Sequence, residues 1–146
     1  MLEILKTAGS ALTAQRLRMD VISSNLANAE ATSTPDGGPY KRERVVFGTS
    51  MRDSLNKLSS SGNSVANGAV AGGVEVKGIV QDQDAPRLVF DPTHPDANED
   101  GFVAYPNVDM ITEMTDMLSA SRSYEANITI VNVAKSMAQR ALDIGR

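Results

Sequence analysis

Apolar residues recur every seven positions in two long stretches, one near each end of the chain. The first stretch has Leu5, Leu12, Met19 and Leu26 in one row and Ala8, Ile22 and Ala29 in the next, and the second stretch has Met110, Met117, Tyr124, Val131 and Ala138. A seven-residue apolar repeat is typical of helices that bury one face against other helices. We therefore expect one helix from about Leu2 to Ala29 and another from about Asn107 to Ile144.

Residues that favour helix boundaries flank both stretches. Asn107 follows Pro106 and is the expected N-cap of the second helix, with Asp109 adding favourable charge in the first turn. Gly145 follows the expected last turn. The run Thr-Pro-Asp-Gly-Gly-Pro at residues 34–39 ends the first helix, because Pro and Gly turn the chain.

Polar residues interrupt both repeats. Gln15 falls in the second row of the first helix, where one polar residue can set the register at some cost in stability. The neighbouring row of the second helix contains Met114, Ser121, Ile128, Lys135 and Leu142. Its two polar positions favour a helix that contacts several neighbours on different faces. From periodicity alone, an intramolecular helical hairpin and packing against other chains both stay open.

The segment between the two helices is rich in Gly, Ser, Asn and Pro and contains short β-branched or aromatic runs. Such runs predict strands at Arg42 to Phe47, Val74 to Val80, Arg87 to Phe90 and Phe102 to Tyr105. Ser59 to Gly73 reads as a flexible loop, and a short helix at Met51 to Leu58 is a weaker possibility. The expected fold is mainly α: long N- and C-terminal helices packed as a coiled-coil-like pair, with a small β-rich insertion between them.

This pattern gives three expected segments. Residues 1–34 form the first helix, residues 35–106 a small β-rich part with the flexible loop at 59–73, and residues 107–146 the second helix. At 146 residues this is one domain's worth of sequence. Only 4% of the residues are aromatic and none is Trp, which favours a small core.

The composition excludes several classes of function. The net charge of −4 argues against nucleic acid as a partner, since phosphate binding needs clustered cations. The absence of cysteine removes disulfides, thiolate metal sites and cysteine nucleophiles. No run approaches the length of a membrane span, so we expect no direct span. The acidic Glu3 and the polar residues that follow it do not fit a cleavable signal peptide.

Two segments of the sequence contain residues that could form a metal-binding or catalytic site. Asp96, Asn98, Asp100 and Gly101 match the first half of a calcium loop. The twelfth position, which should be a bidentate Glu, is Asn107, so a tight turn capped by Asx side chains is the preferred interpretation. We therefore expect neither a metal nor another cofactor.

The single histidine, His94, lies between Pro92 and Pro95 in a segment that predicts a rigid turn. We expect its ring to bond to backbone there. A catalytic imidazole needs a nucleophile and an orienting partner, and the sequence offers no such set. The chain is therefore not expected to be an enzyme.

Several motifs resemble those of bacterial flagellar rod and hook proteins. The segment Ser-Asn-Leu-Ala-Asn-Ala at residues 24–29 is similar to the signature that closes their first helix. The segment at 90–98 (FDPTHPDAN) and those at 101–103, 105–108, 113–114, 121–127 and 135–137 resemble the proximal-rod members of the flagellar basal-body rod family. The turn at 32–38 is longer than the link found in many rod relatives.

The resemblance implies a structural subunit of the flagellar basal body. It implies self-assembly through the terminal helices into a tubular drive shaft that transmits torque and surrounds the export channel. The subunit would be exported by the flagellar type III apparatus without signal cleavage and assemble in the periplasm. Its implied partners are the proximal and distal rod proteins, the membrane-ring protein with its rod adaptor, and the export apparatus.

The alternative function is a soluble coiled-coil adaptor that forms a discrete complex with a partner helix. The expected assembly-interface residues come from the helix rows and the signature segment. They are Leu5, Leu12, Met19, Ile22, Asn25, Leu26, Asn28, Met110, Met117, Tyr124, Ile128, Val131 and Leu142.

Overall fold

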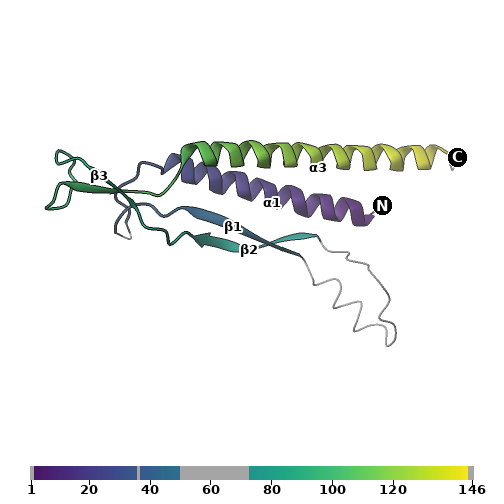
Figure 1. The fold of residues 1–146 in the computed structure, drawn as a ribbon. Helices are drawn as coiled ribbons and strands as arrows, with labels where there is room; N and C mark the ends of the chain where they lie inside the picture. Colours follow the sequence, from purple (N-terminus) through teal and green to yellow (C-terminus); the bar gives the residue numbers. More distant parts are fainter. Residues whose placement is uncertain (1, 36, 50–72, 145–146) are drawn as a thin grey trace, which may run out of the picture. The chain divides into compact units, whose positions relative to one another are not determined.

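The computed structural model describes residues 2–35, 37–49 and 73–144. Two long helices, one at each end of the chain, flank in sequence a small insertion of two antiparallel strand pairs (Figure 1). This is the mainly α architecture that the helical repeats predict. The short helix predicted at 51–58 and most of the loop predicted at 59–73 lie outside the described residues.

The chain divides into two compact units, and each unit contains a section of both helices. Unit 1 comprises residues 1–16, 46–78 and 121–146, and unit 2 comprises residues 17–45 and 79–120. Each unit therefore joins segments that are far apart in the sequence.

Helix α1 spans Leu2–Ala27, two residues shorter than its apolar repeat predicts. The carbonyl of Ser24 accepts bonds from both the backbone N–H and the side-chain amide of Asn28, at 3.1 and 2.9 Å. The N–H of Ala29 bonds to Leu26 instead, three residues back. The tighter turn ends the helix, although Ala29 itself remains buried in unit 2.

Helix α3 spans Met110–Ile144, and its N-cap is Asp109. The two carboxylate oxygens of Asp109 accept bonds from the N–H of Ile111 and from the hydroxyl of Thr112, at 3.1 and 2.7 Å. These bonds lower the pKa of Asp109, the Thr112 hydroxyl having the largest effect. The prediction of Asn107 as the cap is wrong, because the carboxylate two residues later lies within reach of the first free N–H groups.

The described part of the insertion contains four strands, close to their predicted positions. Strand β1 (Glu43–Thr49) pairs with β2 (Val74–Gln81), and β3 (Arg87–Phe90) pairs with β4 (Phe102–Tyr105). In the second pair Phe90 lies opposite Phe102 and Val89 opposite Val103. Alternation along the strands puts Val89 and Val103 on the inward face, where Val103 is fully buried.

The buried residues of the two units differ in kind. In unit 1 they are small, namely Ala8, Ala14 and Ala134. In unit 2 they include Val21, Ile22, Ala29, Val103 and Ala120, together with the polar residues Asn25 and Glu113. Small side chains allow helix backbones to approach closely, which fits the low aromatic content of the chain.

Candidate assembly interface

The inward face of α3 follows an alternating three- and four-residue repeat. It comprises Glu113, Met117, Ala120, Tyr124, Asn127, Val131, Ala134 and Ala138, which are all buried or of intermediate exposure. Met117, Tyr124 and Val131 of the predicted row lie on this face, whereas Met110 at the start of that row is exposed.

The second inward row of α3 is not the one we expected. It runs through Glu113, Ala120, Asn127 and Ala134. In the expected row, Met114 and Ile128 are exposed and Leu142 is 73% exposed. The reason is that the inward row contains the polar residues Glu113 and Asn127. A prediction based on apolar repeats does not identify a row with polar members as buried.

On α1 the second predicted row is the more deeply buried one. Ala8 and Ile22 in that row are buried, whereas the first row has intermediate exposure. That first row consists of Leu5, Leu12, Met19 and Leu26. Gln15, the polar interruption, has its side-chain oxygen buried without a hydrogen-bond partner among the described residues.

A cluster of hydrogen-bonded polar side chains lies in unit 2, where α1 and α3 meet. Asn25 and Glu113 are each 1% exposed, and the Asn25 amide donates to the Glu113 carboxylate at 3.1 Å. Nε of Arg42 donates to the other carboxylate oxygen at 2.6 Å, and a terminal nitrogen of its guanidinium also contacts that oxygen. The buried carboxylate is thus both charge-paired and hydrogen-bonded, as burial of a charge requires.

The other atoms of the Asn25 amide connect the link after α1 to the same cluster. Its oxygen accepts from the Tyr40 hydroxyl at 3.0 Å and from the N–H of Glu43 at 2.9 Å. Its nitrogen also donates to the Glu43 carbonyl at 2.8 Å. One side chain therefore joins α1, the start of β1 and α3, a role that the signature segment at 24–29 did not reveal.

Asp116, one turn after Glu113, extends the cluster toward solvent. Its carboxylate lies 3.3 Å from Arg18 of α1 and 3.9 Å from Arg42. Both Arg18 and Asp116 are partly exposed, so water screens this pair more than the Glu113 pair.

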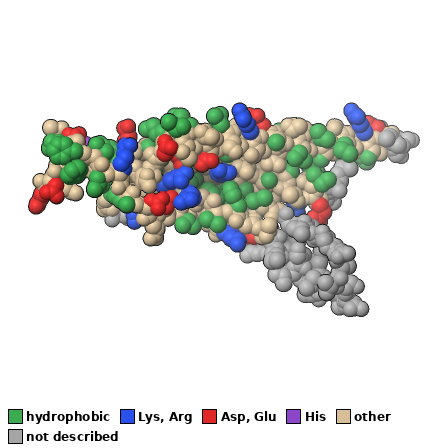
Figure 2. Space-filling model, viewed as in Figure 1, with side chains coloured by type: hydrophobic (Ala, Val, Ile, Leu, Met, Phe, Trp, Pro, Cys, Tyr) green, Lys and Arg blue, Asp and Glu red, His purple; other side chains and the backbone are tan. Residues whose placement is uncertain are grey.

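Outside the inward face, α3 carries large apolar side chains that are exposed, by 38% to 76% of their surface. In unit 2 these are Met110, Ile111, Met114 and Leu118, and in unit 1 they are Ile128, Ile130, Val133, Met137 and Leu142. Figure 2 shows hydrophobic side chains along the edge of the view where α3 lies in Figure 1. Contiguous exposed apolar residues on a helix mark an interaction site.

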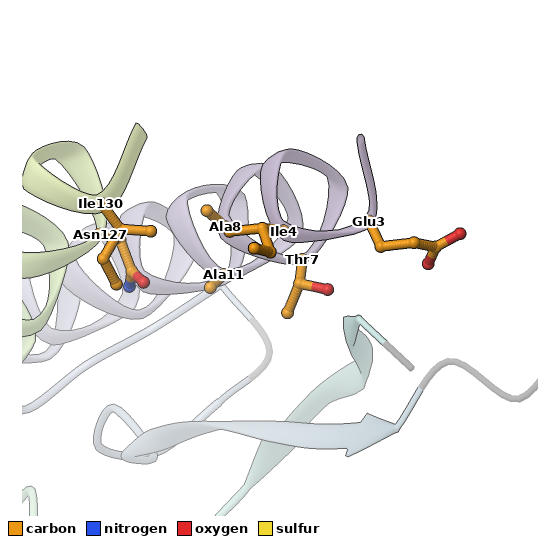
Figure 3. Close-up of a pocket in the computed structure, with 7 residues that line it drawn as sticks. All are labelled: Glu3, Ile4, Thr7, Ala8, Ala11, Asn127 and Ile130. Carbon is orange, nitrogen blue, oxygen red and sulfur yellow. The ribbon is translucent and has the colours of Figure 1, made fainter. Parts of the chain in front are cut away.

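Unit 1 also has a shallow apolar groove of about 320 Å³ between its sections of α1 and α3 (Figure 3). Its lining residues are Glu3, Ile4, Thr7, Ala8 and Ala11 of α1 and Asn127 and Ile130 of α3. Ala8 is buried, whereas Ile4 and Ile130 are about half exposed.

The residues considered above as catalytic or metal-binding candidates instead form hydrogen bonds that stabilise turns. Nδ1 of His94 accepts the N–H of Asp96 at 3.1 Å, which confirms the expected bond to backbone. The Asp96 carboxylate accepts from the Thr32 hydroxyl at 2.7 Å. Hydrogen bonds from Thr93, its hydroxyl first, lower the pKa of Asp91. Within the described residues, no three His, Asp or Glu side chains are grouped as metal ligands.

Among the described residues, no helix combines the length and the apolar character needed to cross a membrane. The charged residues and the Asn and Thr positions on both long helices account for this result.

Two family models match the chain, and they match its two helical ends. Residues 5–33 match the model described as "Flagella basal body rod protein", and residues 99–144 match "Flagellar basal body rod FlgEFG protein C-terminal". The first match covers most of α1 and the link after it, and the second covers β4 and α3.

Relatives similar over nearly their whole length carry the description "Flagellar basal-body rod protein FlgC". The protein from Bacillus subtilis is 46% identical over an alignment of 150 positions, gaps included, which covers 97% of this chain and 96% of the relative. Those from Borreliella burgdorferi and Escherichia coli O157:H7 are 44% and 42% identical and cover 96% and 100% of this chain. The same matches cover 94% and 98% of those two relatives.

Proposed function

Because the chain belongs to the FlgC family of flagellar basal-body rod proteins, we propose that it builds a tubular drive shaft by self-assembly through its terminal helices. The family is one of rod structural subunits, in keeping with a protein that is not an enzyme. The shaft transmits torque and surrounds the export channel. The finer placement, in the proximal rod within the periplasm, belongs to the same proposal.

One observation carries this proposal. The helix α3 has an inward face that packs in each unit, and it also has large apolar side chains on other faces, such as Ile111 at 76% exposure. A helix that packs only in an intramolecular hairpin does not need exposed apolar side chains, because such side chains promote association with other molecules. Neighbouring subunits that cover these rows supply the stiffness of a shaft through many interdigitated contacts.

The segments have different roles under this proposal. Residues 1–34 and 107–146 form the inner tube, and the β-rich residues 35–106 lie outside it and make lateral contacts. The partners are the proximal and distal rod proteins, the membrane-ring protein with its rod adaptor, and the flagellar type III export apparatus. No nucleic acid or cofactor takes part.

The test is incorporation into the basal body of the source bacterium. A strain lacking the native gene receives a tagged chain, and basal bodies are purified and probed for the tag. We expect the chain in the rod and motility restored, with an intact mass that shows whether any leader was removed. Normal motility in the strain without the gene would overturn the proposal.

Two variants test whether the helices carry assembly. Leu12→Asp and Ile128→Asp introduce a charge into the helix rows, and we expect neither variant in purified basal bodies. The control is Thr129→Asp, which adds the same charge about 100° further around α3 at an exposed polar position. Normal rods from both Leu12→Asp and Ile128→Asp would count against helix-driven assembly.

A second measurement separates the shaft from the soluble adaptor. Limited proteolysis of the purified chain, read by mass spectrometry, reports whether both ends are protected before assembly. Trimmed ends with a resistant middle favour helices that become ordered with neighbours. Protected ends in a complex of one discrete mass favour the adaptor.

A further inference from the structure

The unit 2 section of α3 presents three exposed apolar residues in helical spacing. Ile111, Met114 and Leu118 stand at i, i+3 and i+7, so they lie on one face of the helix, away from the buried Glu113. We call these three residues the α3 ridge. At 1.5 Å per residue the ridge is about 10 Å long.

The groove of unit 1 has matching dimensions and chemistry. It follows α1 from Glu3 to Ala11, also about two turns, and its floor is lowered by Ala8 and Ala11 (Figure 3). Its lining is mainly apolar: the polar lining residues are Glu3 at one end, Thr7 along α1 and Asn127 from α3. The groove therefore fits a row of aliphatic side chains better than a polar ligand.

We propose that the α3 ridge of one copy of this chain docks in the unit 1 groove of a second copy. The inference rests on the proposed function and names the contact that joins successive copies. The ridge and the groove are different surfaces, so each copy can offer one and accept the other. Such a head-to-tail contact generates an open helical assembly rather than a closed dimer.

Charge sets the direction of docking. Arg122 is exposed one turn after Leu118, and Glu3 is exposed one residue before Ile4. With the ridge antiparallel to α1 of the receiving copy, Arg122 meets Glu3, Leu118 meets Ile4, and Ile111 reaches Ala11. In the opposite direction Leu118 lies at Ala11, Arg122 lies beyond the groove near Gln15, and Glu3 is left without a positive charge across the contact.

Cysteine pairing tests this arrangement, because the chain has no cysteine of its own. Two differently tagged copies, one Ile4→Cys and one Leu118→Cys, are co-expressed in the source bacterium, and rods are purified and oxidised. We expect a disulfide between the two tags. The bond requires Cα atoms about 4.4–6.8 Å apart, so it reports direct contact. Both positions are exposed, so neither substitution removes buried packing.

The matched control replaces the next residue, Ser119→Cys, about 100° around the same helix. We expect it to give several-fold less product with Ile4→Cys than Leu118→Cys gives. Motile cells whose rods contain both tags but no Ile4–Leu118 product would overturn the inference and leave the proposed function standing. So would Ile4→Cys bonded to a different rod protein or to another Ile4→Cys copy. Absence of the chain from the rod would instead overturn the proposed function.

Discussion

The side-chain amide of Asn25 on α1 donates a hydrogen bond of 3.1 Å to the carboxylate of Glu113 on α3, 88 positions later in the chain. Both side chains are almost fully buried. A polar pair at this depth is stable only in the register that satisfies it, because a one-residue shift leaves a charged group without its partner. The pair therefore specifies how α1 and α3 align within unit 2.

Asn25→Leu removes one of the hydrogen-bond donors to Glu113 and also the acceptor used by Tyr40 and by the N–H of Glu43. We expect the free energy of unfolding to fall by about 1–3 kcal/mol, as is typical when buried polar groups lose their partners. Urea unfolding followed by circular dichroism measures the change. The control is Asn28→Leu, where only a bond to Ser24 is lost, and an equal loss in both variants would contradict a special role for Asn25.

Arg18→Ala breaks the partly exposed pair with Asp116. Because water screens this pair, we expect the free energy of unfolding to fall by no more than about 1 kcal/mol. Arg42→Ala, which leaves the buried Glu113 without its charged partner, should have the larger effect in the same urea titration. The reverse order would show that Asp116, and not Glu113, is the charge on which unit 2 depends.

The cap of α3 predicts a pH dependence with a definite sign. Hydrogen bonds hold the pKa of Asp109 below that of an unfolded aspartate, about 3.9. The stabilisation is therefore complete above the unfolded pKa and is lost as the pH falls through the lower folded pKa. Asp109→Asn keeps an acceptor but cannot titrate, so its urea midpoint should vary less between pH 5 and pH 2. Parallel profiles would contradict the cap.

The two faces of the β3–β4 pair should respond differently to truncation. Val103 is fully buried, and Val103→Ala should cost about 1.5–3 kcal/mol. Leu88 is 61% exposed on the opposite face, and Leu88→Ala should change the free energy of unfolding by no more than about 0.5 kcal/mol. Thermal unfolding of both variants measures the difference. Equal losses would mean that Leu88 is also covered in the isolated chain.

Gly101 should be intolerant of a side chain. Its φ of +79° is a left-handed conformation, and an added Cβ would lie 3.0 Å from Cε2 of Phe90. Gly101→Ala should therefore lower the free energy of unfolding by about 1–2 kcal/mol. The control is Gly78→Ala, where no atom lies within 4 Å of the added Cβ. A harmless Gly101→Ala would show that the 91–101 turn can rearrange.

The sequence predicts the two helices and four strands well, because their periodicity and turn residues are local signals. The bounds of β3 and β4 agree residue for residue. The N-cap of α3 is off by two residues, since Asn107 and Asp109 are both good caps and only the chain path selects between them. Local signals thus fix the elements but not their ends.

The inward rows were harder to predict, for a physical reason. A helix row that contains Glu113 and Asn127 looks solvent-facing, and its burial depends on partners from α1 and from the link after it. Arg42 and Tyr40, which complete the cluster, are 71 and 15 positions from the atoms that they bond. Hydrophobic periodicity carries no information about such partners. The pairing of Asn25 with Glu113 therefore cannot be predicted from the sequence, although the motif at residues 24–29 does identify Asn25 as an interface residue.

The buried cluster also has a consequence for the timing of folding. Two of its bonds, those of Asn25 and Arg42 to Glu113, join residues 88 and 71 positions apart, so the polypeptide must close long loops before either of them forms. Until residue 113 is available, Asn25 lacks that acceptor and Arg42 lacks that carboxylate. A chain delivered with its N-terminus first can thus complete unit 2 only after most of its length has emerged, and helix alignment becomes a late event.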